Sequence, residues 1–201
     1  QNYPSGQTEW LNAENNPENE EAGEREIPFS GNLYIEREDF KEEANRKFFR
    51  LSLGKEVRLK NAYIIKGEEV IKDNQGNITE IICSYDPLSK SGSGTEESQR
   101  KVKGTLHWVS AEHALPIKVN LYDRLFSVEE PDKDKESDPE EFINPHSLER
   151  VNGHIEPTVS NASKGEKFQF QRLGYFVLDE NKDGNLVFNK TVGLRDTWSK
   201  N

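Results

Sequence analysis

The run VRLKNAYIIK, residues 57–66, gives the clearest signal of fold class because apolar and polar side chains alternate along it. Successive side chains of a β-strand point to opposite faces of a sheet. The run therefore predicts a strand with one buried face and with Arg58 and Lys60 on the other. Residues 74–77, with the sequence NQGN, predict a hairpin turn into a second strand over residues 78–85.

Short strands are expected over much of the remaining chain. They lie at residues 102–109, 117–126, 149–157, 167–178 and 186–192. Asp183-Gly184 predicts a hairpin between the last two. Strands do not alternate with long helices, so a parallel sheet is not expected, and short strands at this spacing favour barrels or sandwiches. We expect an all-β fold of antiparallel strands in two cores, with two or three short helices.

Three segments are expected to contain helical turns. Apolar residues in the segment 39–51 recur about every four positions, which predicts an amphipathic helix. Ser110 is a suitable cap for a single turn before Pro116. Asp138 followed by a proline predicts the start of another short helix. Residues 86–99, rich in Ser and Gly, are expected to form a mobile loop.

Charge is distributed unevenly along the chain, which has 37 acidic and 27 basic residues and a formal charge of −10. Residues 1–30 and 129–141 each carry a net charge of −6, whereas residues 41–66 hold eight basic and three acidic side chains. A basic cluster in an acidic protein is expected when one surface meets a polyanion and other surfaces avoid it. A solvated basic face is the alternative interpretation.

Several classes of protein are excluded by the composition. No apolar window approaches the roughly 18–20 residues of a membrane span and no signal-peptide core is found, so we expect a cytoplasmic protein. The single Cys83 rules out an internal disulfide; a small buried side chain is its expected role, and a reactive thiol is the alternative. The chain has no Met and begins with Gln1, which indicates a fragment or a processed product.

Motifs typical of catalysis or metal binding are not found. The four histidines are scattered, without an HExxH arrangement or an i, i+4 pair. Residues 179–184, DENKDG, match the first half of an EF-hand loop, but Lys190 stands where the bidentate Glu belongs. An acidic hairpin tip is the better interpretation of this segment.

Blocks spread over nearly the whole chain resemble one known family. They are IPFSG (27–31), YIEREDF (34–40), EEAN (42–45), LGKEVRLKNAYIIK (53–66), KVKGTLHWVSAEHALPIKVNLYDRLFS (101–127), FINPHSL (142–148), FQFQRLGYF (168–176) and VFNKTVGLRDTW (187–198). In this order they are similar to the anticodon-binding region of the glutaminyl-tRNA synthetase family. Residues 1–26 resemble, more loosely, the segment that leads into that region.

The resemblance implies a piece of a class I aminoacyl-tRNA synthetase with two antiparallel β-barrels of the ribosomal-protein anticodon-binding type. The parent enzyme joins glutamine to its tRNA with ATP and Mg²⁺, in an upstream catalytic domain whose signature motifs are not found here. The fragment is therefore expected to hold no cofactor and no catalytic residue and to be inactive alone. Its implied partners are the anticodon loop of glutamine tRNA and the upstream catalytic domain of the same polypeptide, and neither DNA nor a membrane.

The matching motifs also imply which side chains contact the anticodon. Arg58 and Lys60 of the VRLKN run correspond to family positions at the wobble end. Arg46, Lys47 and Arg50, which follow the EEAN block, resemble the cluster that reads the first and third bases. Arginine suits the reading of base edges through its planar fork, whereas lysine supplies a point charge to phosphate. An ordinary solvated strand face is the alternative for the first pair.

A third set of contacts is implied by the FQFQR block. Gln169 and Arg172 resemble the pair that grips the middle uridine. Alternation places Gln169 on the exposed face and the neighbouring phenylalanines in the core, so Arg172 needs a local bulge or turn to join it. A salt bridge is the alternative role for Arg172. Phe49 falls where a basic residue can occur, so a contact there can be replaced by stacking.

The expected organisation has four parts. Residues 1–26 form an acidic loop or tail, residues 27–128 include the distal barrel, residues 129–141 form an acidic linker, and residues 142–201 complete the proximal barrel. Two other functions stay open. One is a protein-interaction module that keeps the barrels without RNA binding, and the other is the anticodon domain of a related glutamate-charging synthetase.

Overall fold

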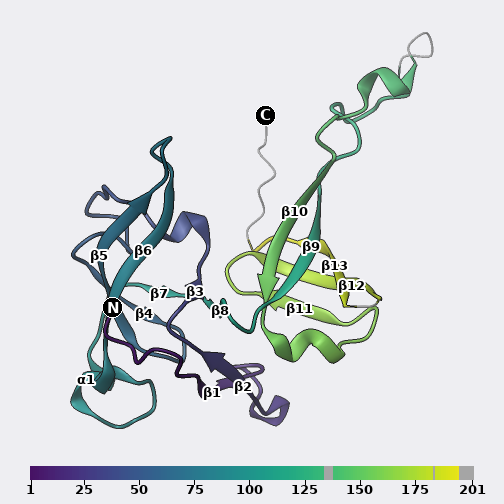
Figure 1. Cartoon of the computed structure of the whole chain (residues 1–201). Coiled ribbons are helices and arrows are strands. Elements are labelled where there is room, and N and C mark those ends of the chain that lie inside the picture. The colour runs from purple at the N-terminus through teal and green to yellow at the C-terminus, as the bar shows by residue number, and fades with distance from the viewer. Residues whose placement is uncertain (134–137, 183, 195–201) are drawn as a thin grey trace. The chain divides into compact units, whose positions relative to one another are not determined.

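The computed structural model describes residues 1–133, 138–182 and 184–194, and the regular secondary structure of this part is mostly β-strand (Figure 1). The chain divides into two units. The first unit comprises Gln1–Ala114 and Glu156–Thr158, and the second comprises Leu115–Ile155 and Val159–Asn201. In the described part of the chain, no helix combines the length and the apolar character that a membrane crossing requires.

The first unit contains three small sheets. Its elements are β1 (Glu9–Glu14), η1 (Glu20–Ala22), β2 (Glu24–Phe29), β3 (Leu33–Tyr34), η2 (Arg37–Asp39), β4 (Glu56–Leu59), β5 (Ile64–Lys72), β6 (Ile78–Asp86), η3 (Pro87–Ser89), α1 (Glu96–Gln99), β7 (Thr105–Leu106) and β8 (Val109–Ser110), where η denotes a 3-10 helix. Strand β1 pairs with β2, and β3 with β8, while the largest sheet has the order β6-β5-β4-β7.

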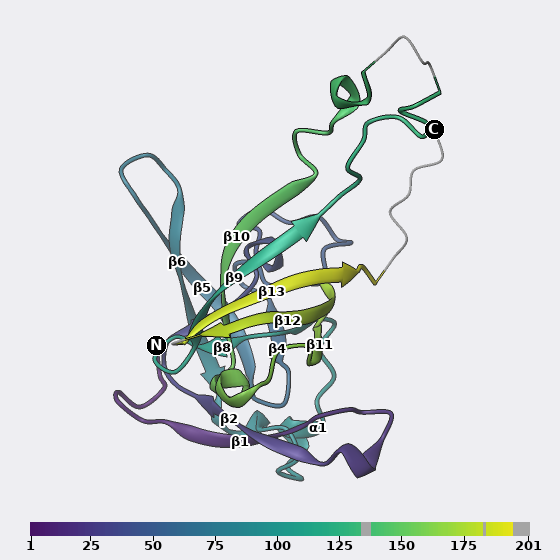
Figure 2. The same cartoon turned by 90° about the vertical axis from the view of Figure 1, so that its right-hand side faces the viewer.

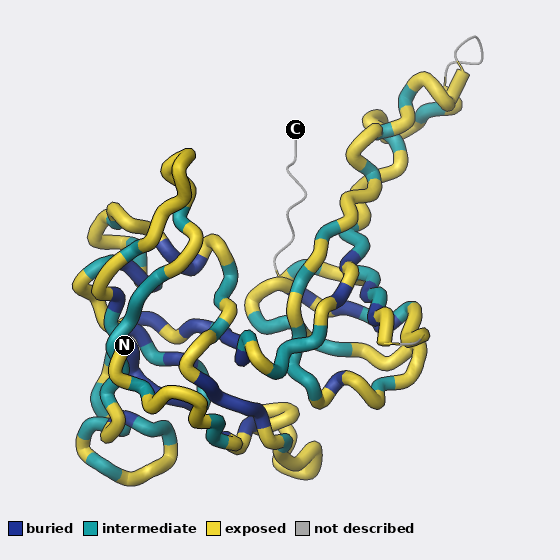
Figure 3. Tube along the Cα trace, in the orientation of Figure 1, coloured by how far each residue is buried: buried dark blue, intermediate teal, exposed yellow. Residues whose placement is uncertain are grey.

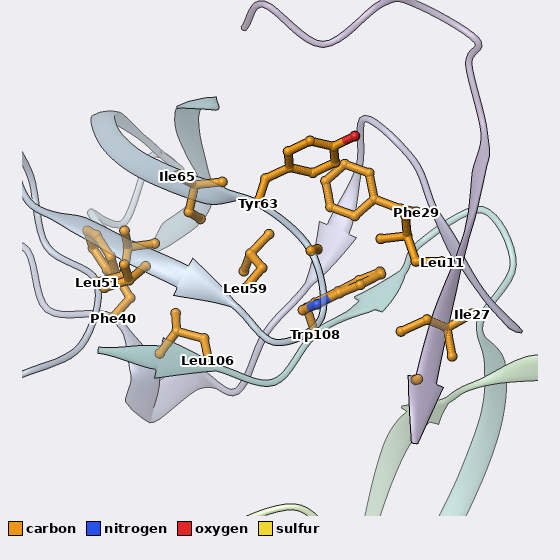
Figure 4. Close-up of a cluster of buried hydrophobic side chains, with 13 residues drawn as sticks. Leu11, Ile27, Phe29, Phe40, Leu51, Leu59, Tyr63, Ile65, Leu106 and Trp108 are labelled. Atoms are coloured by element: carbon orange, nitrogen blue, oxygen red, sulfur yellow. The ribbon is translucent and has the colours of Figure 1, made fainter. Parts of the chain in front are cut away.

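Aliphatic and aromatic side chains pack together in the core of the first unit (Figure 4). The Phe29 ring centroid lies 5.2 Å from that of Tyr63 and 5.0 Å from that of Trp108. The indole N–H of Trp108 donates to the carbonyl of Lys60 at 2.9 Å. Because a buried tryptophan N–H requires an acceptor, this bond ties the turn after β4 to the core.

The run 57–66 is not one strand, as predicted, but two strands joined by a turn. Strand β4 ends at Leu59 and β5 begins at Ile64, and the two pair antiparallel. Between them Asn61 has a φ of +60°, and the N–H of Leu59 donates to the carbonyl of Tyr63 at 2.8 Å. Asparagine enters the left-handed region more readily than most residues. The turn therefore interrupts an alternation that looks continuous in the sequence.

The predicted helix over residues 39–51 is wrong. Phe40 and Leu51 are buried, as the pattern requires, but they form a parallel bridge that closes a loop. Within the loop, the side chain of Asn45 accepts the N–H of Lys47 at 2.9 Å. Such side-chain-to-backbone bonds compete with helical hydrogen bonds. The apolar spacing was correct for burial but not for backbone conformation.

Three smaller expectations have mixed outcomes. The segment 86–99, predicted as a mobile loop, contains η3 and α1. The turn after Ser110 is confirmed, since the carbonyl of Ser110 accepts the N–H of Ala114 at 2.8 Å. The helix start at Asp138 is also confirmed: η4 (Pro139–Phe142) follows it, and the Asp138 side chain accepts the N–H of Glu140.

The second unit is built on one five-stranded sheet, with the order β10-β9-β13-β12-β11 (Figure 2). Its strands are β9 (Leu115–Tyr122), β10 (Leu148–Ile155), β11 (Lys167–Phe170), β12 (Gly174–Lys182) and β13 (Asn185–Val192), and η5 (Pro157–Asn161) precedes β11. Phe188 and Leu178 are fully buried in its core. The chain between β9 and β10 is largely exposed where it is described (Figure 3).

The two predicted hairpins are confirmed, but the strands are not all antiparallel. Strands β5 and β6 pair antiparallel, as do β12 and β13. Two pairs, β4 with β7 and β9 with β13, are parallel. Parallel pairing needs a connection of about a dozen residues or more, and the long segments between β4 and β7 and between β9 and β13 meet this requirement. The sequence pattern did not show which distant strands would become neighbours.

The described strands form open sheets. The two larger sheets end at edge strands, β6 and β7 in one and β10 and β11 in the other. The fold is therefore mostly β, with one short α-helix and several 3-10 turns among the described residues. Parts of three expectations lie outside the described residues: Asp183 of a hairpin turn, residues 134–137 of the acidic linker and residues 195–198 of the last family block.

Candidate nucleic-acid interface

Residues 41–50 of the first unit form a loop rich in basic residues, and the parallel β-bridge between Phe40 and Leu51 closes this loop. It carries three of the residues singled out in the sequence, namely Arg46, Lys47 and Arg50. The loop is held at its base, because the Arg50 guanidinium donates to the carbonyl of Glu38 at 3.1 Å and lies 3.3 Å from the buried Asp39 carboxylate. Arg46 and Lys47 are exposed further along the loop.

A hollow of about 490 Å³ lies beside this loop. Arg46, Phe49 and Arg50 line it from the loop, and Lys55, Lys103 and Gly104 line it from neighbouring segments. The lining also includes the carboxylate-bearing Glu56, but both of its oxygens accept hydrogen bonds from Arg100. The lining therefore combines four cationic side chains with an acid that is already paired. Such an arrangement favours a polyanionic ligand.

Gly104 fixes how closely two walls of the hollow approach each other. A Cβ at this position would lie 2.3 Å from the carbonyl oxygen of Phe49 and 3.1 Å from Cγ1 of Val57. The carbonyl of Gly104 also accepts the N–H of Arg58 at 2.8 Å. A side chain here would push the loop away, so the glycine sets the position of Phe49.

Arg58 lies on β4, and its guanidinium donates to acceptors of this same unit. It bonds to the carbonyls of Ser89 and Ser98 at 2.8 and 2.9 Å, and more weakly to the carbonyl of Arg100 and the hydroxyl of Ser91. Burial lowers the pKa of Arg58, and the nearby Arg100 adds to the effect. The side chain thus holds the segment 89–100, and its contact with RNA stays a prediction.

Lys60 follows β4 directly and occupies the turn that Asn61 makes. Its N–H donates to the carbonyl of Leu106 at 2.9 Å and its carbonyl accepts from Trp108, so its backbone is firmly placed. The residue itself is only half-buried. The turn therefore fixes the backbone that carries the Lys60 ammonium group, and its contact with phosphate stays a prediction.

Gln169 and Arg172 belong to the second unit, in β11 and in the turn after it. Phe168 and Phe170 pack against the core, so Gln169 is exposed between them, as the alternation predicted. Arg172 has a φ of +64° in the tight turn between β11 and β12. This turn confirms the local departure from strand geometry that Arg172 was expected to need.

The structure therefore groups the candidate residues within each unit. Arg46 and Arg50 share the hollow, Lys47 lies on the same loop, and Gln169 and Arg172 are neighbours within the second unit. Sequence reasoning missed Lys55 and Lys103 as parts of the same site. The motif KVKG offered a signal for Lys103, because a glycine beside basic residues marks a close approach of the backbone.

Metal binding and thiol chemistry have no structural support in the described residues. Among them, no group of three or more His, Cys, Asp or Glu side chains could hold a metal ion. Cys83 is partly buried in β6, and burial raises its pKa to about 11. A thiol with that pKa is protonated at neutral pH, which fits a packing role.

Comparison with known proteins identifies the family to which this chain belongs. A family profile described as "tRNA synthetases class I (E and Q), anti-codon binding domain" matches residues 1–86, and a second profile of the same description matches residues 105–179. The glutamine–tRNA ligase of Rhodopirellula baltica is 55% identical over 203 residues, covering 99% of this chain and 33% of that protein. Those of Enterobacter sp. and Citrobacter koseri are 52% and 51% identical over the whole chain, which covers 36% of each.

The chain thus spans about a third of the length of these relatives. The two profiles between them cover most of the chain and both units of the structure. The chain belongs to the anticodon-binding domain family of the class I tRNA synthetases for glutamate and glutamine.

Proposed function

We propose that this chain is the part of a glutamine–tRNA ligase that binds the anticodon loop of glutamine tRNA. The observation that carries the proposal is the hollow in the first unit, which Arg46, Arg50, Lys55 and Lys103 line together with the exposed ring of Phe49. Cationic and aromatic groups together suit the splayed, unstacked bases of an RNA loop. The glutamine–tRNA ligases among the relatives support glutamine rather than glutamate as the amino acid.

The proposed contacts divide into two kinds. Base reading is assigned to side chains with a planar fork or an amide, and phosphate binding to lysines. The full set of proposed contacts is Arg46, Lys47, Arg50, Arg58, Lys60, Gln169 and Arg172. Gln169 and Arg172 together read the middle base, since both are presented where β11 ends.

The proposal also covers the catalytic reaction and cellular location of the longer polypeptide, and the barrel architecture of the two units. Joining of glutamine to tRNA, with ATP and Mg²⁺, is assigned to a catalytic domain of the same polypeptide outside this chain. We also propose a cytoplasmic location, and that each unit completes a β-barrel of the ribosomal-protein type. The matching relatives support a domain outside this chain, because each extends well beyond the segment that corresponds to it. The barrels and the location rest on the family resemblance of the sequence blocks, since the described strands form open sheets.

The test is a titration of the chain with glutamine tRNA and with the same tRNA altered at the middle anticodon base, at moderate salt. We expect tighter binding to the unaltered tRNA. Arg172→Ala should remove that preference, because one bidentate base contact supplies roughly 1–3 kcal/mol of discrimination in DNA complexes. Equal losses for all anticodon variants would contradict the role of Arg172. No binding of a folded chain to either tRNA would favour a protein-interaction module.

Lys60→Ala provides a second test, of phosphate rather than base contact. It should weaken all anticodon variants to a similar extent. It should also reduce the salt slope of the binding constant by about 0.7, the value for one single-strand phosphate contact. An unchanged slope would remove Lys60 from that role.

A further inference from the structure

Two consecutive phenylalanines of the basic loop have different environments. Phe48 is half-buried, and the ammonium group of Lys41 lies 5.2 Å from the centre of its ring. Both rings line the hollow, but Phe49 is 51% exposed. What distinguishes Phe49 from its neighbour is that its more exposed ring lies in a hollow lined by cationic side chains, where a ligand can reach it.

The position of Phe49 is set from two directions. Gly104 allows the backbone of the segment 102–104 to meet the carbonyl of Phe49, where a Cβ would lie only 2.3 Å away. From the same segment, the ammonium group of Lys103 lies 5.5 Å from the centre of the Phe49 ring. The Lys103 ammonium group therefore stabilises the position of the Phe49 ring, while about half of the surface of Phe49 stays exposed.

The hollow has the size and the charge for a nucleotide. Its volume of about 490 Å³ lies within the usual range for small-ligand pockets, roughly 300–1,000 Å³. Arg46, Arg50 and Lys55 supply positive charge around it, and Glu56 is paired with Arg100. A base placed against Phe49 would thus have its phosphate among cationic groups, of which the Lys103 ammonium lies 5.5 Å from the ring centre.

We infer that Phe49 and Lys103 form a platform for one unstacked base of the anticodon loop, with the base on the open surface of the Phe49 ring and its phosphate beside Lys103. This inference rests on the proposed function. Stacking accepts every base because each has a π-face. Phe49 therefore contributes affinity at one loop position without reading the base there, and Arg46 and Arg50 are left to distinguish base edges.

The test uses the 201-residue chain and an anticodon stem–loop RNA that carries 2-aminopurine at one loop position at a time. Stacking on an aromatic ring quenches 2-aminopurine fluorescence. Binding of the wild-type chain should therefore lower the fluorescence of the probe at one loop position more than at the others. Phe49→Leu should abolish that quenching and raise Kd about tenfold, the loss expected for one base–aromatic stack. Phe49→Trp should preserve both the quenching and the affinity.

Lys103→Ala should raise Kd for every base at that position and reduce the salt slope by about 0.7. Two controls match the variants: Trp10→Leu replaces an equally exposed aromatic on β1, and Lys101→Ala removes an exposed lysine two residues from Lys103. Neither control residue lines the hollow.

The outcomes separate the platform from the function on which it rests. Loss of quenching at one position in Phe49→Leu, with both controls unchanged, would support the platform. Binding by the wild type with the same quenching pattern in Phe49→Leu would overturn the platform and leave anticodon binding intact. Failure of the folded wild-type chain to bind the stem–loop at all would overturn both.

Discussion

The guanidinium of Arg58 donates to three backbone carbonyls and one hydroxyl, all between Ser89 and Arg100. In Arg58→Ala these partly buried acceptors lose a charged donor, which costs more than the loss of a neutral hydrogen bond. We expect the free energy of unfolding to fall by about 2–3 kcal/mol. Amide hydrogen exchange over residues 89–100 should also become faster.

Hydrogen-exchange mass spectrometry and urea unfolding measure these two effects. Lys101→Ala, in the exposed segment after Arg100, is the matched control and should change neither. Unchanged protection of residues 89–100 in Arg58→Ala would mean that other contacts hold the segment.

Gly104 gives the second prediction at the scale of one residue. Gly104→Ala would place a Cβ 2.3 Å from the carbonyl of Phe49, so the basic loop must move. We expect a destabilisation of about 1–3 kcal/mol, typical of overpacking. Weaker RNA binding should accompany it. The control is Gly31→Ala, where the new Cβ would meet only the Tyr3 ring at 3.7 Å. Native stability in Gly104→Ala would argue against the close approach.

At the scale of elements, the sequence predicted burial better than backbone conformation. Phe40 and Leu51 are buried as their spacing indicated, yet they close a loop rather than lie on a helix. The Asn45 side chain and the ion pair between Arg50 and Asp39 stabilise that loop. A single-sequence pattern contains no information on such contacts, because they depend on where distant segments pack.

In the candidate site, too, the sequence predicted some features and not others. The family motifs directed attention to Arg46 and Arg50, which do share one hollow. They gave no indication that Arg58 is engaged with carbonyls of a segment that begins 31 residues away, at Ser89. The role of Lys103 also depends on a contact across the fold, with Phe49. Residue types and local spacing are readable from sequence, whereas partners distant along the chain are not.

The hairpin of β11 and β12 allows stability and binding to be separated. The Phe170 ring stacks on Phe176, with centroids 4.1 Å apart, and meets the edge of Phe188. Phe170→Ala should lower the free energy of unfolding by about 3 kcal/mol, the lower end of the range for such truncations, because the ring is only partly buried. Gln169→Ala, on the exposed face of the same strand, should change stability by less than about 0.5 kcal/mol.

Urea unfolding and RNA titration of the two variants provide the comparison. Gln169→Ala should lose discrimination at the middle anticodon base although it stays folded. If Phe170→Ala unfolds no more easily than Gln169→Ala, the aromatic cluster does not anchor β11.

At the scale of the whole chain, an ion pair joins segments that are far apart in sequence. The chain leaves the first unit after Ala114 and returns to it at Glu156–Thr158. There the Glu156 carboxylate accepts two hydrogen bonds from Arg25, at 2.6 and 2.9 Å, and lies 3.8 Å from the His107 ring. Residues 25 and 156 are 131 positions apart, so the pair closes a very long loop.

This ion pair should make the stability of the first unit depend on pH. Burial alone would raise the pKa of Glu156, but the hydrogen bonds and charges of His107 and Arg25 together lower it from 4.5 to about 2. A carboxyl whose pKa is lower in the folded state stabilises the fold above its unfolded pKa. The contribution is lost as the pH falls from about 4.5 towards 2, and linkage puts it at roughly 3 kcal/mol.

Glu156→Gln tests this assignment by urea unfolding at several pH values. The variant should be less stable than the wild type at pH 7. The difference should shrink as the pH falls below about 4.5, because the Glu156 carboxyl of the unfolded wild-type chain then takes up a proton while the folded carboxylate stays charged until about pH 2. Glu69→Gln, which alters an exposed glutamate of β5, should show no such convergence. A difference that stayed constant down to pH 3 would mean that Glu156 acts through its shape rather than through its charge. The return of the chain to the first unit would then depend on packing around Glu156–Thr158 instead of on the ion pair with Arg25.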